Sequence, residues 1–198
     1  MLLTPGPTPV PEFVRKAMSD ITIHHRTEEF EAIFKNTREL LIELYDMPEV
    51  VMLASSGTGA MEACVTNLTH KKALTINSGK FGERFGKICA AFGIDYTEIK
   101  NEWNTPVSVE AVINAIKTDS SIDAVFIQIC ESAGGLRHPV EEIAAEIKKI
   151  NKDITIVADG ITAVGVEKID TTNLDAVITG SQKAFMLPPG LAMIGLSN

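Results

Sequence analysis

Short runs of apolar residues alternate with stretches of helical spacing from about residue 50 to the end of the chain. Runs of this length that are rich in Val, Ile and Leu predict buried strands, and the stretches between them predict helices. The expected strands lie at 50–54, 73–77, 94–99, 122–129, 154–158, 174–179 and 191–196, and the expected helices between them at 58–68, 80–92, 108–117 and 139–150. This alternation predicts an α/β fold, a three-layer α/β/α arrangement with a mostly parallel seven-stranded sheet.

The first fifty residues follow a different pattern. Residues 1–10 are rich in Pro and Gly and predict a loop, and residues 11–19 predict a short helix. From Thr27 apolar residues recur at helical spacing, and Thr27 is the expected N-cap of this longer helix, which Pro48 ends. The N-terminal part therefore differs from the alternating region that follows it.

The last two connections are too short for long helices. Little room is left between the strand that ends at Ala158 and the one that begins at Leu174, or between Gly180 and Leu191. A parallel connection needs a crossover of a dozen or more residues. The connection between Gly180 and Leu191 is shorter than this, so we expect the final strand to run antiparallel.

Composition narrows the class of protein. The chain has 198 residues, 45% hydrophobic and 22% charged, with a net charge of −8, which fits a globular domain and argues against a nucleic-acid partner. The three cysteines are widely spaced without a C-x-x-C pair, so neither a disulfide framework nor a metal site is indicated. Residues 1–9 lack a basic, apolar leader pattern, and prolines interrupt the longest uncharged stretch, 184–198. We therefore expect a cytoplasmic protein that does not span a membrane.

Candidate ligand-binding residues follow several of the predicted strands. Thr58 and Gly59 lie in a Gly- and hydroxyl-rich turn before a helix, which is typical of phosphate binding, although a simple tight turn is the alternative. Phe81, between two glycines, can stack on a flat ring or belong to the core. Ser132 offers a hydroxyl in what is otherwise a simple loop. In parallel sheets these positions meet at one edge.

Two charged residues stand in apolar surroundings. Asp159 ends an apolar strand, where a carboxylate is costly to bury without a cationic partner, and a helix N-cap is its alternative role. Lys183 is the one charge between Asp175 and Asn198. Such a lysine either extends its amine to solvent or, when desolvated, acts as a nucleophile toward a carbonyl. Pyridoxal phosphate requires such a set, a lysine that binds its aldehyde and an acid for its ring nitrogen.

With these motifs the sequence resembles the class V aminotransferases of pyridoxal-phosphate fold type I, and among them the alanine–glyoxylate and serine–pyruvate (serine–glyoxylate) enzymes. The resemblance covers essentially the whole chain. It rests on LTPGPT at 3–8, HHR at 24–26, SGTG at 56–59, NSGKFG at 77–82, GSQKA at 180–184 and LPPG at 187–190.

The resemblance implies a role for each site residue. Lys183 would form the Schiff base and carry the proton, and Asp159 would pair with the pyridine nitrogen. Phe81 and Ile161 would cover the two faces of the ring, and Ser132 would bind its hydroxyl. Thr58, Gly59 and Gln182 would bind the phosphate, and Gly6 would line the substrate pocket.

The resemblance also implies an organisation and a reaction. Residues 1–20 would form a loop and short helix that line the substrate site, and 21–198 the cofactor-binding large domain. Relatives are nearly twice as long, so we expect the chain to lack their small C-terminal domain and its carboxylate-binding arginine. The implied reaction exchanges an amino group between a small amino acid, such as alanine, serine or aspartate, and glyoxylate or pyruvate. A homodimer is implied, with His24 and His25 as structural or interface residues.

Other functions stay open on the sequence. A catalytically inactive, cofactor-binding fragment is one, since no arginine for the substrate carboxylate is visible. Cysteine desulfuration is another, although desulfurases carry histidines where this chain has Phe81 and Gln182. A departure also stands at Ala133, where many relatives have a further hydroxyl. A plain nucleotide-binding domain would leave Lys183 and Asp159 unexplained.

Overall fold

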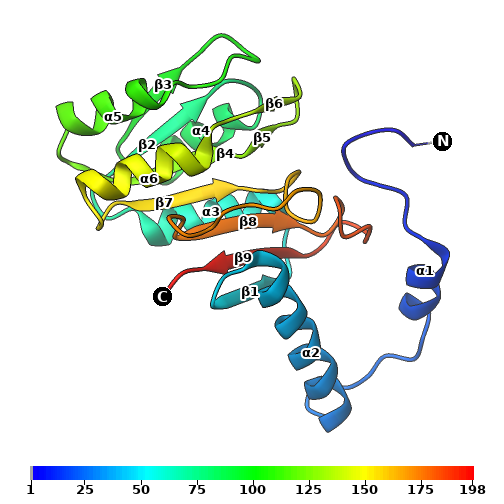
Figure 1. Ribbon diagram of the computed structural model, residues 1–198. Coiled ribbons are helices and arrows are strands. Elements are labelled where there is room, and N and C mark those ends of the chain that lie inside the picture. The colour runs from blue at the N-terminus through cyan, green and yellow to red at the C-terminus, as the bar shows by residue number, and fades with distance from the viewer. Residues whose placement is uncertain (1) are drawn as a thin grey trace.

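A seven-stranded sheet forms the middle of the computed structural model, which describes residues 2–198 (Figure 1). Its strands follow the order β1-β9-β8-β7-β4-β2-β3. Each predicted strand is present within two residues of its expected ends. Their bounds are β1 Glu49–Leu53, β2 Lys72–Asn77, β3 Tyr96–Lys100, β4 Ile122–Gln128, β7 Thr155–Asp159, β8 Ala176–Gly180 and β9 Ala192–Leu196.

Strand β9 runs against the other six. It pairs antiparallel with both β1 and β8, while β8, β7, β4, β2 and β3 pair in parallel. In Figure 1 its arrow points opposite to those of β7 and β8. The predicted antiparallel last strand is therefore confirmed, and the remaining strands all end at the same edge of the sheet.

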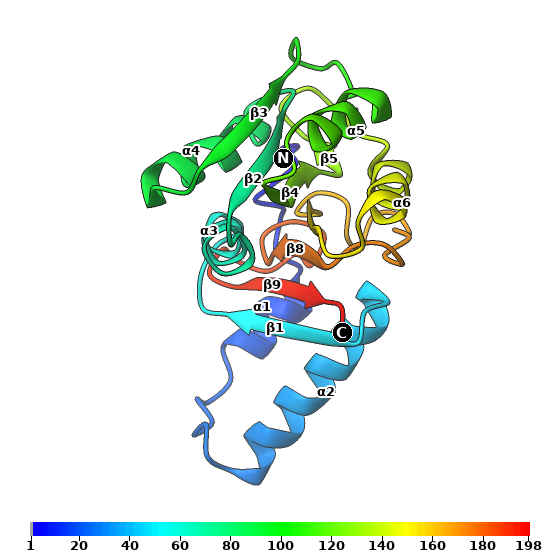
Figure 2. The ribbon, with the colours of Figure 1, turned by 90° about the vertical axis from the view of Figure 1, so that its left-hand side faces the viewer.

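Helices cover both faces of the sheet, as the alternation predicted (Figure 2). On one face α2, α5 and α6 contribute to a large apolar cluster, and on the other α3 and α4 contribute to a second. Helix α1 buries no residue. The bounds are α1 Glu12–Met18, α2 Glu28–Tyr45, α3 Gly57–Leu68, α4 Gly82–Phe92, α5 Val109–Thr118 and α6 Val140–Ile150.

Strand β4 shows why these sequences form a doubly covered sheet. Val125 and Ile127 belong to the first cluster, and Ala124 and Phe126 belong to the second, all fully buried. Successive side chains of a strand point to opposite faces, so a strand covered on both sides reads as a continuous apolar run. None of the described helices is both long and apolar enough to cross a membrane.

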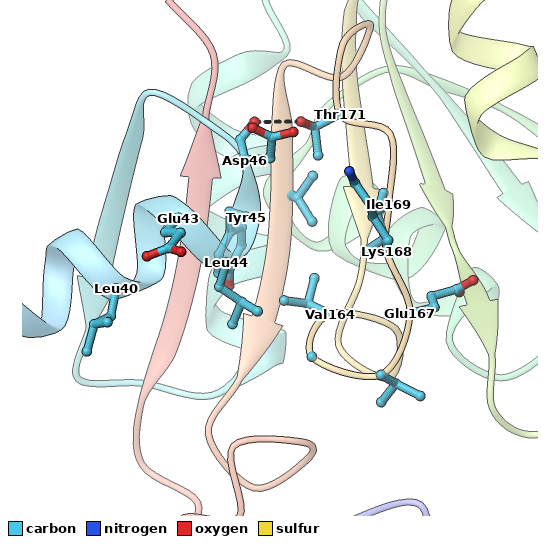
Figure 3. A pocket seen from close by; sticks show the side chains of 13 residues that line it. Leu40, Glu43, Leu44, Tyr45, Asp46, Val164, Glu167, Lys168, Ile169 and Thr171 are labelled. Atoms are coloured by element: carbon cyan, nitrogen blue, oxygen red, sulfur yellow. Dashed lines mark hydrogen bonds between the residues drawn. The ribbon is translucent and has the colours of Figure 1, made fainter.

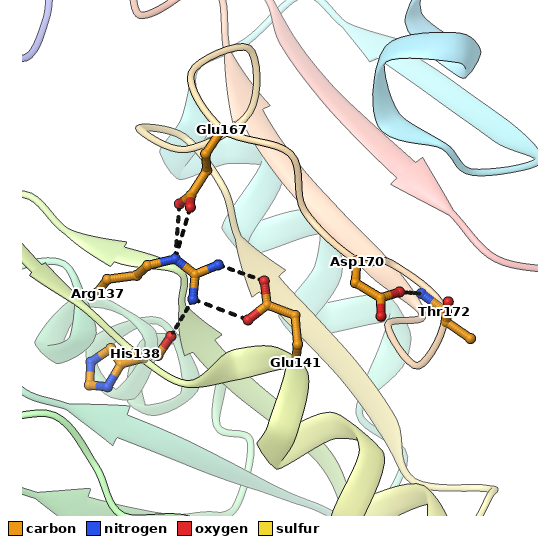
Figure 4. A network of polar contacts seen from close by, with 6 residues as sticks. All are labelled: Arg137, His138, Glu141, Glu167, Asp170 and Thr172. Atoms are coloured by element: carbon orange, nitrogen blue, oxygen red, sulfur yellow. Dashed lines mark hydrogen bonds and ion pairs between the residues drawn. The ribbon is translucent and has the colours of Figure 1, made fainter.

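A small hairpin corrects the expectation of a simple loop after β4. Strand β5 (Cys130–Glu131) pairs antiparallel with β6 (Leu136–Arg137), and the predicted strand 122–129 ends at Gln128. Two-residue strands are too short to leave a period in the sequence. The hairpin is fixed by Arg137, whose guanidinium binds the carboxylates of Glu141 and Glu167 (Figure 4).

The residue after this hairpin, His138, should make stability depend on pH. Its side chain is 1% exposed, its Nδ1 accepts a hydrogen bond from the Val107 N–H, and burial lowers its pKa to about 4. The unfolded chain has a His pKa of about 6.5 and so binds more protons than the folded chain between pH 6.5 and 4. We expect the free energy of unfolding to fall by up to about 3 kcal/mol across this window as the pH is lowered.

Urea unfolding at several pH values measures this slope. The His138→Gln variant should lose that part of the pH dependence, and a His70→Gln variant, altered at an exposed histidine, should keep it. An unchanged slope in His138→Gln would contradict the assignment.

Candidate active site

The predicted site residues meet at the edge where the parallel strands end. Asp159 is the last residue of β7, and Lys183 lies three residues after the end of β8. These two strands are neighbours in the sheet. Phe81, Ser132, Asp159, Ile161 and Lys183 line one cavity, together with Cys130 and Thr162. Its free volume is about 10 Å³.

The turn after β1 begins helix α3 with a local cap. The Ser56 hydroxyl accepts a hydrogen bond from the Gly59 N–H at 3.3 Å. A side chain at Gly59 would meet Ser55, and one at Gly57 would meet Ile161, so both glycines are needed for close packing. The first turn of a helix leaves N–H groups without helical partners, which suits an anion such as phosphate.

Phe81 is held in place by a buried carboxylate that is not among the predicted site residues. The N–H groups of Phe81 and Gly82 both donate to Glu131 Oε2 at 2.9 Å, and the Ala133 N–H donates to Oε1 at 3.2 Å. Glu131 is fully buried. One side chain thus joins the loop of Phe81 to the loop of Ser132, on two walls of the cavity. Its signal in the sequence is an acid two residues beyond an apolar run that ends at Ile129.

Asp159 is buried at the end of β7, with 4% of its surface exposed. Its Oδ1 accepts a hydrogen bond from the Ile161 N–H at 2.9 Å, but no helix follows, so the N-cap alternative is wrong. Burial raises its pKa to about 6, and the positive charges of Arg84 and Lys183 offset this in part. The protonated ring nitrogen of a bound pyridoxal phosphate would supply the direct cationic partner for Asp159.

Lys183 is half-buried beneath the N-terminal loop. A side chain at Gly6 would lie 2.3 Å from Lys183 Cδ and 2.7 Å from Nζ, so the Gly6 backbone rests directly on the lysine. Thr8 fastens this loop, since its N–H donates to Gln182 O at 3.0 Å and its hydroxyl to Lys183 O at 2.9 Å. Desolvation lowers the pKa of Lys183, opposed by Asp159 and aided by Arg84.

Gln182 lies near the first turn of α3. Its Oε1 is buried without a hydrogen-bond partner among residues 2–198. A Cβ atom added at Gly180 would lie 3.0 Å from this oxygen and 3.5 Å from the backbone nitrogen of Gly57, so Gln182 and the start of α3 lie close to the same point. Rotation of this amide would present an N–H to an oxyanion beside α3. Together with the buried acid, the desolvated amine and the aromatic ring, this unpaired group gives a donor set that fits pyridoxal phosphate.

A second cavity, of about 760 Å³, opens between α2 and the segment 164–171 (Figure 3). Its lining includes Leu44, Tyr45, Val164 and Ile169 and none of the predicted site residues. The described residues also contain no cluster of three or more His, Cys, Asp or Glu side chains arranged to hold a metal. His24 and His25 stack on each other, with ring centroids 4.7 Å apart.

Comparison with known proteins gives consistent matches. The family model described as Aminotransferase class-V matches residues 2–198. An uncharacterized aminotransferase of Helicobacter pylori strain J99 is 52% identical over 197 residues, which are 100% of this chain and 53% of that protein. The L-aspartate–glyoxylate aminotransferase of Paracoccus denitrificans is 29% identical, over 99% of this chain and 52% of that protein.

A solved structure agrees with the sequence matches. The crystal structure of an aspartate aminotransferase from Thermus thermophilus superposes with a TM-score of 0.90 at 31% identity, over 98% of this chain and 56% of that chain. The chain thus spans about half the length of the curated relatives it matches.

Proposed function

The chain belongs to the class-V aminotransferases, and from this premise we propose that the protein carries out pyridoxal-phosphate-dependent transamination between a small amino acid and a 2-oxo acid. Alanine, serine or aspartate is the proposed donor, and glyoxylate or pyruvate the proposed acceptor. The relative named as an L-aspartate–glyoxylate aminotransferase supports this substrate class. The observation that carries the proposal is the shared cavity of Lys183, Asp159 and Phe81.

The proposed cofactor contacts divide between the ring and the phosphate. Asp159 would bind the ring nitrogen, Ser132 the ring hydroxyl, and Phe81 and Ile161 the two faces, since all four line the cavity. The phosphate would lie at the first turn of α3, near Thr58, Gly59 and Gln182. When bound, the cofactor would supply an aldehyde for amines and a ring that accepts the electron pair of a substrate carbon.

Lys183 has two proposed tasks in this reaction. Its Nζ would hold the cofactor, and once a substrate amine takes that place, the free Nζ would move a proton from the substrate Cα. A lysine is a base only in its neutral form, so the lowered pKa of Lys183 increases the fraction ready to accept a proton. Asp159 in its ionised form would hold the proton on the ring nitrogen.

The N-terminal residues and the assembly complete the proposal. Residues 1–20, of which residue 1 lies outside the described part of the chain, are proposed to line the substrate site, and 21–198 to form the cofactor-binding domain. Gly6 lies against Lys183 and Thr8 binds the same segment, which supports this division. We also propose a homodimer in the cytoplasm. Helix α1 has no buried residue within one chain, and its large apolar side chains Phe13 and Met18 are 73% and 58% exposed. This exposed apolar surface supports contact with a second copy.

Covalent labelling tests the assignment of Lys183. After incubation with pyridoxal phosphate and reduction with borohydride, peptide mass spectrometry should find the cofactor on Lys183. The Lys80→Arg variant, altered at an exposed lysine near the site, should be labelled equally. Bound cofactor with an unlabelled Lys183 would refute the proposal.

A further inference from the structure

The guanidinium of Arg84 joins two parts of the proposed cofactor site. Arg84 lies in the first turn of α4, directly after the loop of Phe81. Its Nη1 donates a hydrogen bond to the Thr58 hydroxyl at 2.9 Å, and its Cζ lies 4.9 Å from the centre of the Phe81 ring. The guanidinium is therefore one hydrogen bond away from the first turn of α3.

The charge of Arg84 has no carboxylate partner. Across residues 2–198 it forms no ion pair, and Thr58 accepts its one side-chain hydrogen bond. In contrast, Arg38 binds one carboxylate through two of its nitrogens, and Arg137 binds two carboxylates through three. Arg84 is half-buried, so its charge is less well hydrated than that of an exposed arginine. Four of its five N–H donors are left for a ligand.

The surroundings of Arg84 favour an oxyanion. The first turn of α3 offers backbone N–H groups and the positive end of a twelve-residue helix. Gln182 lies on the same side of the site, and rotation of its amide, whose buried Oε1 has no hydrogen-bond partner within 2–198, would present an N–H to an oxyanion. A planar guanidinium with free donors matches phosphate oxygens in geometry as well as in charge.

We infer that Arg84 is a further phosphate-binding residue of the cofactor site, acting together with the first turn of α3. This inference rests on the proposed function. Arg84 would hold Thr58 and face the phosphate with its remaining donors. Desolvation is the main cause that lowers the pKa of Lys183, and Asp159 acts in the opposite direction. The charge of Arg84 lowers this pKa further, so it also favours the neutral amine.

The test compares ligands with and without phosphate. Pyridoxine 5′-phosphate and pyridoxine have no aldehyde, so their binding does not depend on the reaction with Lys183. Calorimetric titration of the purified protein should show that Arg84→Gln weakens pyridoxine 5′-phosphate binding by about 10- to 100-fold. Pyridoxine binding should stay within about twofold. Arg84→Lys keeps the charge but not the fork of donors, so its loss should be smaller.

Each outcome separates this inference from the proposed function. If Arg84→Gln weakens both ligands equally, Arg84 acts by placing Phe81, and the inference is wrong. Unchanged binding of both ligands also overturns it, while the proposed function stands. If the unaltered protein binds neither compound nor pyridoxal phosphate, the proposed function itself fails. The Arg26→Gln variant, altered at an exposed arginine, should bind like the unaltered protein.

Discussion

Replacing Lys183 with alanine should reduce transamination by about 10⁴-fold or more, because one amine both holds the cofactor and moves the proton. Neither task has a substitute nearby, since the other groups that line the cavity are Phe81, Ser132, Asp159 and uncharged side chains. The measurement is kcat/KM, with whichever of alanine, serine and aspartate the unaltered protein uses best and with glyoxylate as acceptor.

A small amine distinguishes lost chemistry from lost folding in this variant. Alanine leaves space where the Lys183 side chain lay against Gly6, so added methylamine or ethylamine should restore part of the activity. The Lys80→Ala variant should keep the activity of the unaltered protein, because Lys80 pairs with Glu83 outside the cavity. Turnover by Lys183→Ala within tenfold of the unaltered protein would show that Lys183 is not the essential amine.

The fold was predictable because its signals are local. A strand covered on both faces, such as β4, reads as an apolar run, and a helix such as α3 begins at a capping hydroxyl. Asp159 and Lys183 could be singled out for a related reason. A charge in an apolar stretch conflicts with burial, so it stands out in the sequence by itself.

The contacts that bring the site together depend on tertiary structure. Arg84 meets Thr58 across 26 positions of sequence, and Glu131 meets Phe81 across 50. Thr8 reaches Lys183 across 175. No spacing rule links such pairs, because their distance is set by the order of strands in the sheet and not by the chain between them. Thr8, Thr58, Phe81 and Lys183 are part of the motifs, but Arg84 and Glu131 are not, and none of these contacts was predictable from the sequence.

Replacing Asp159 with asparagine should lower kcat/KM by about 10²- to 10³-fold, the size expected when one preorganised charge is removed from an active site. Asparagine has nearly the shape of aspartate and can still accept the hydrogen bond of the Ile161 N–H. It carries no negative charge, so it cannot hold a proton on a ring nitrogen. The Asp153→Asn variant, altered at an exposed position, should behave like the unaltered protein.

The same substitution should stabilise the cofactor-free protein above pH 6. The pKa of Asp159 is about 6 in the folded chain and about 3.9 in an unfolded one, so the folded chain binds more protons between these values. Its free energy of unfolding therefore falls as the pH rises from 4 to 6, by up to about 3 kcal/mol, whereas asparagine adds no such slope. Urea unfolding at pH 4.5 and 7.5 measures the difference between the two proteins. A variant that is less active yet more stable at pH 7.5 would mark Asp159 as a residue kept for its charge. If the variant and the unaltered protein are equally stable at each of the two pH values, a buried, ionised carboxylate at position 159 is contradicted.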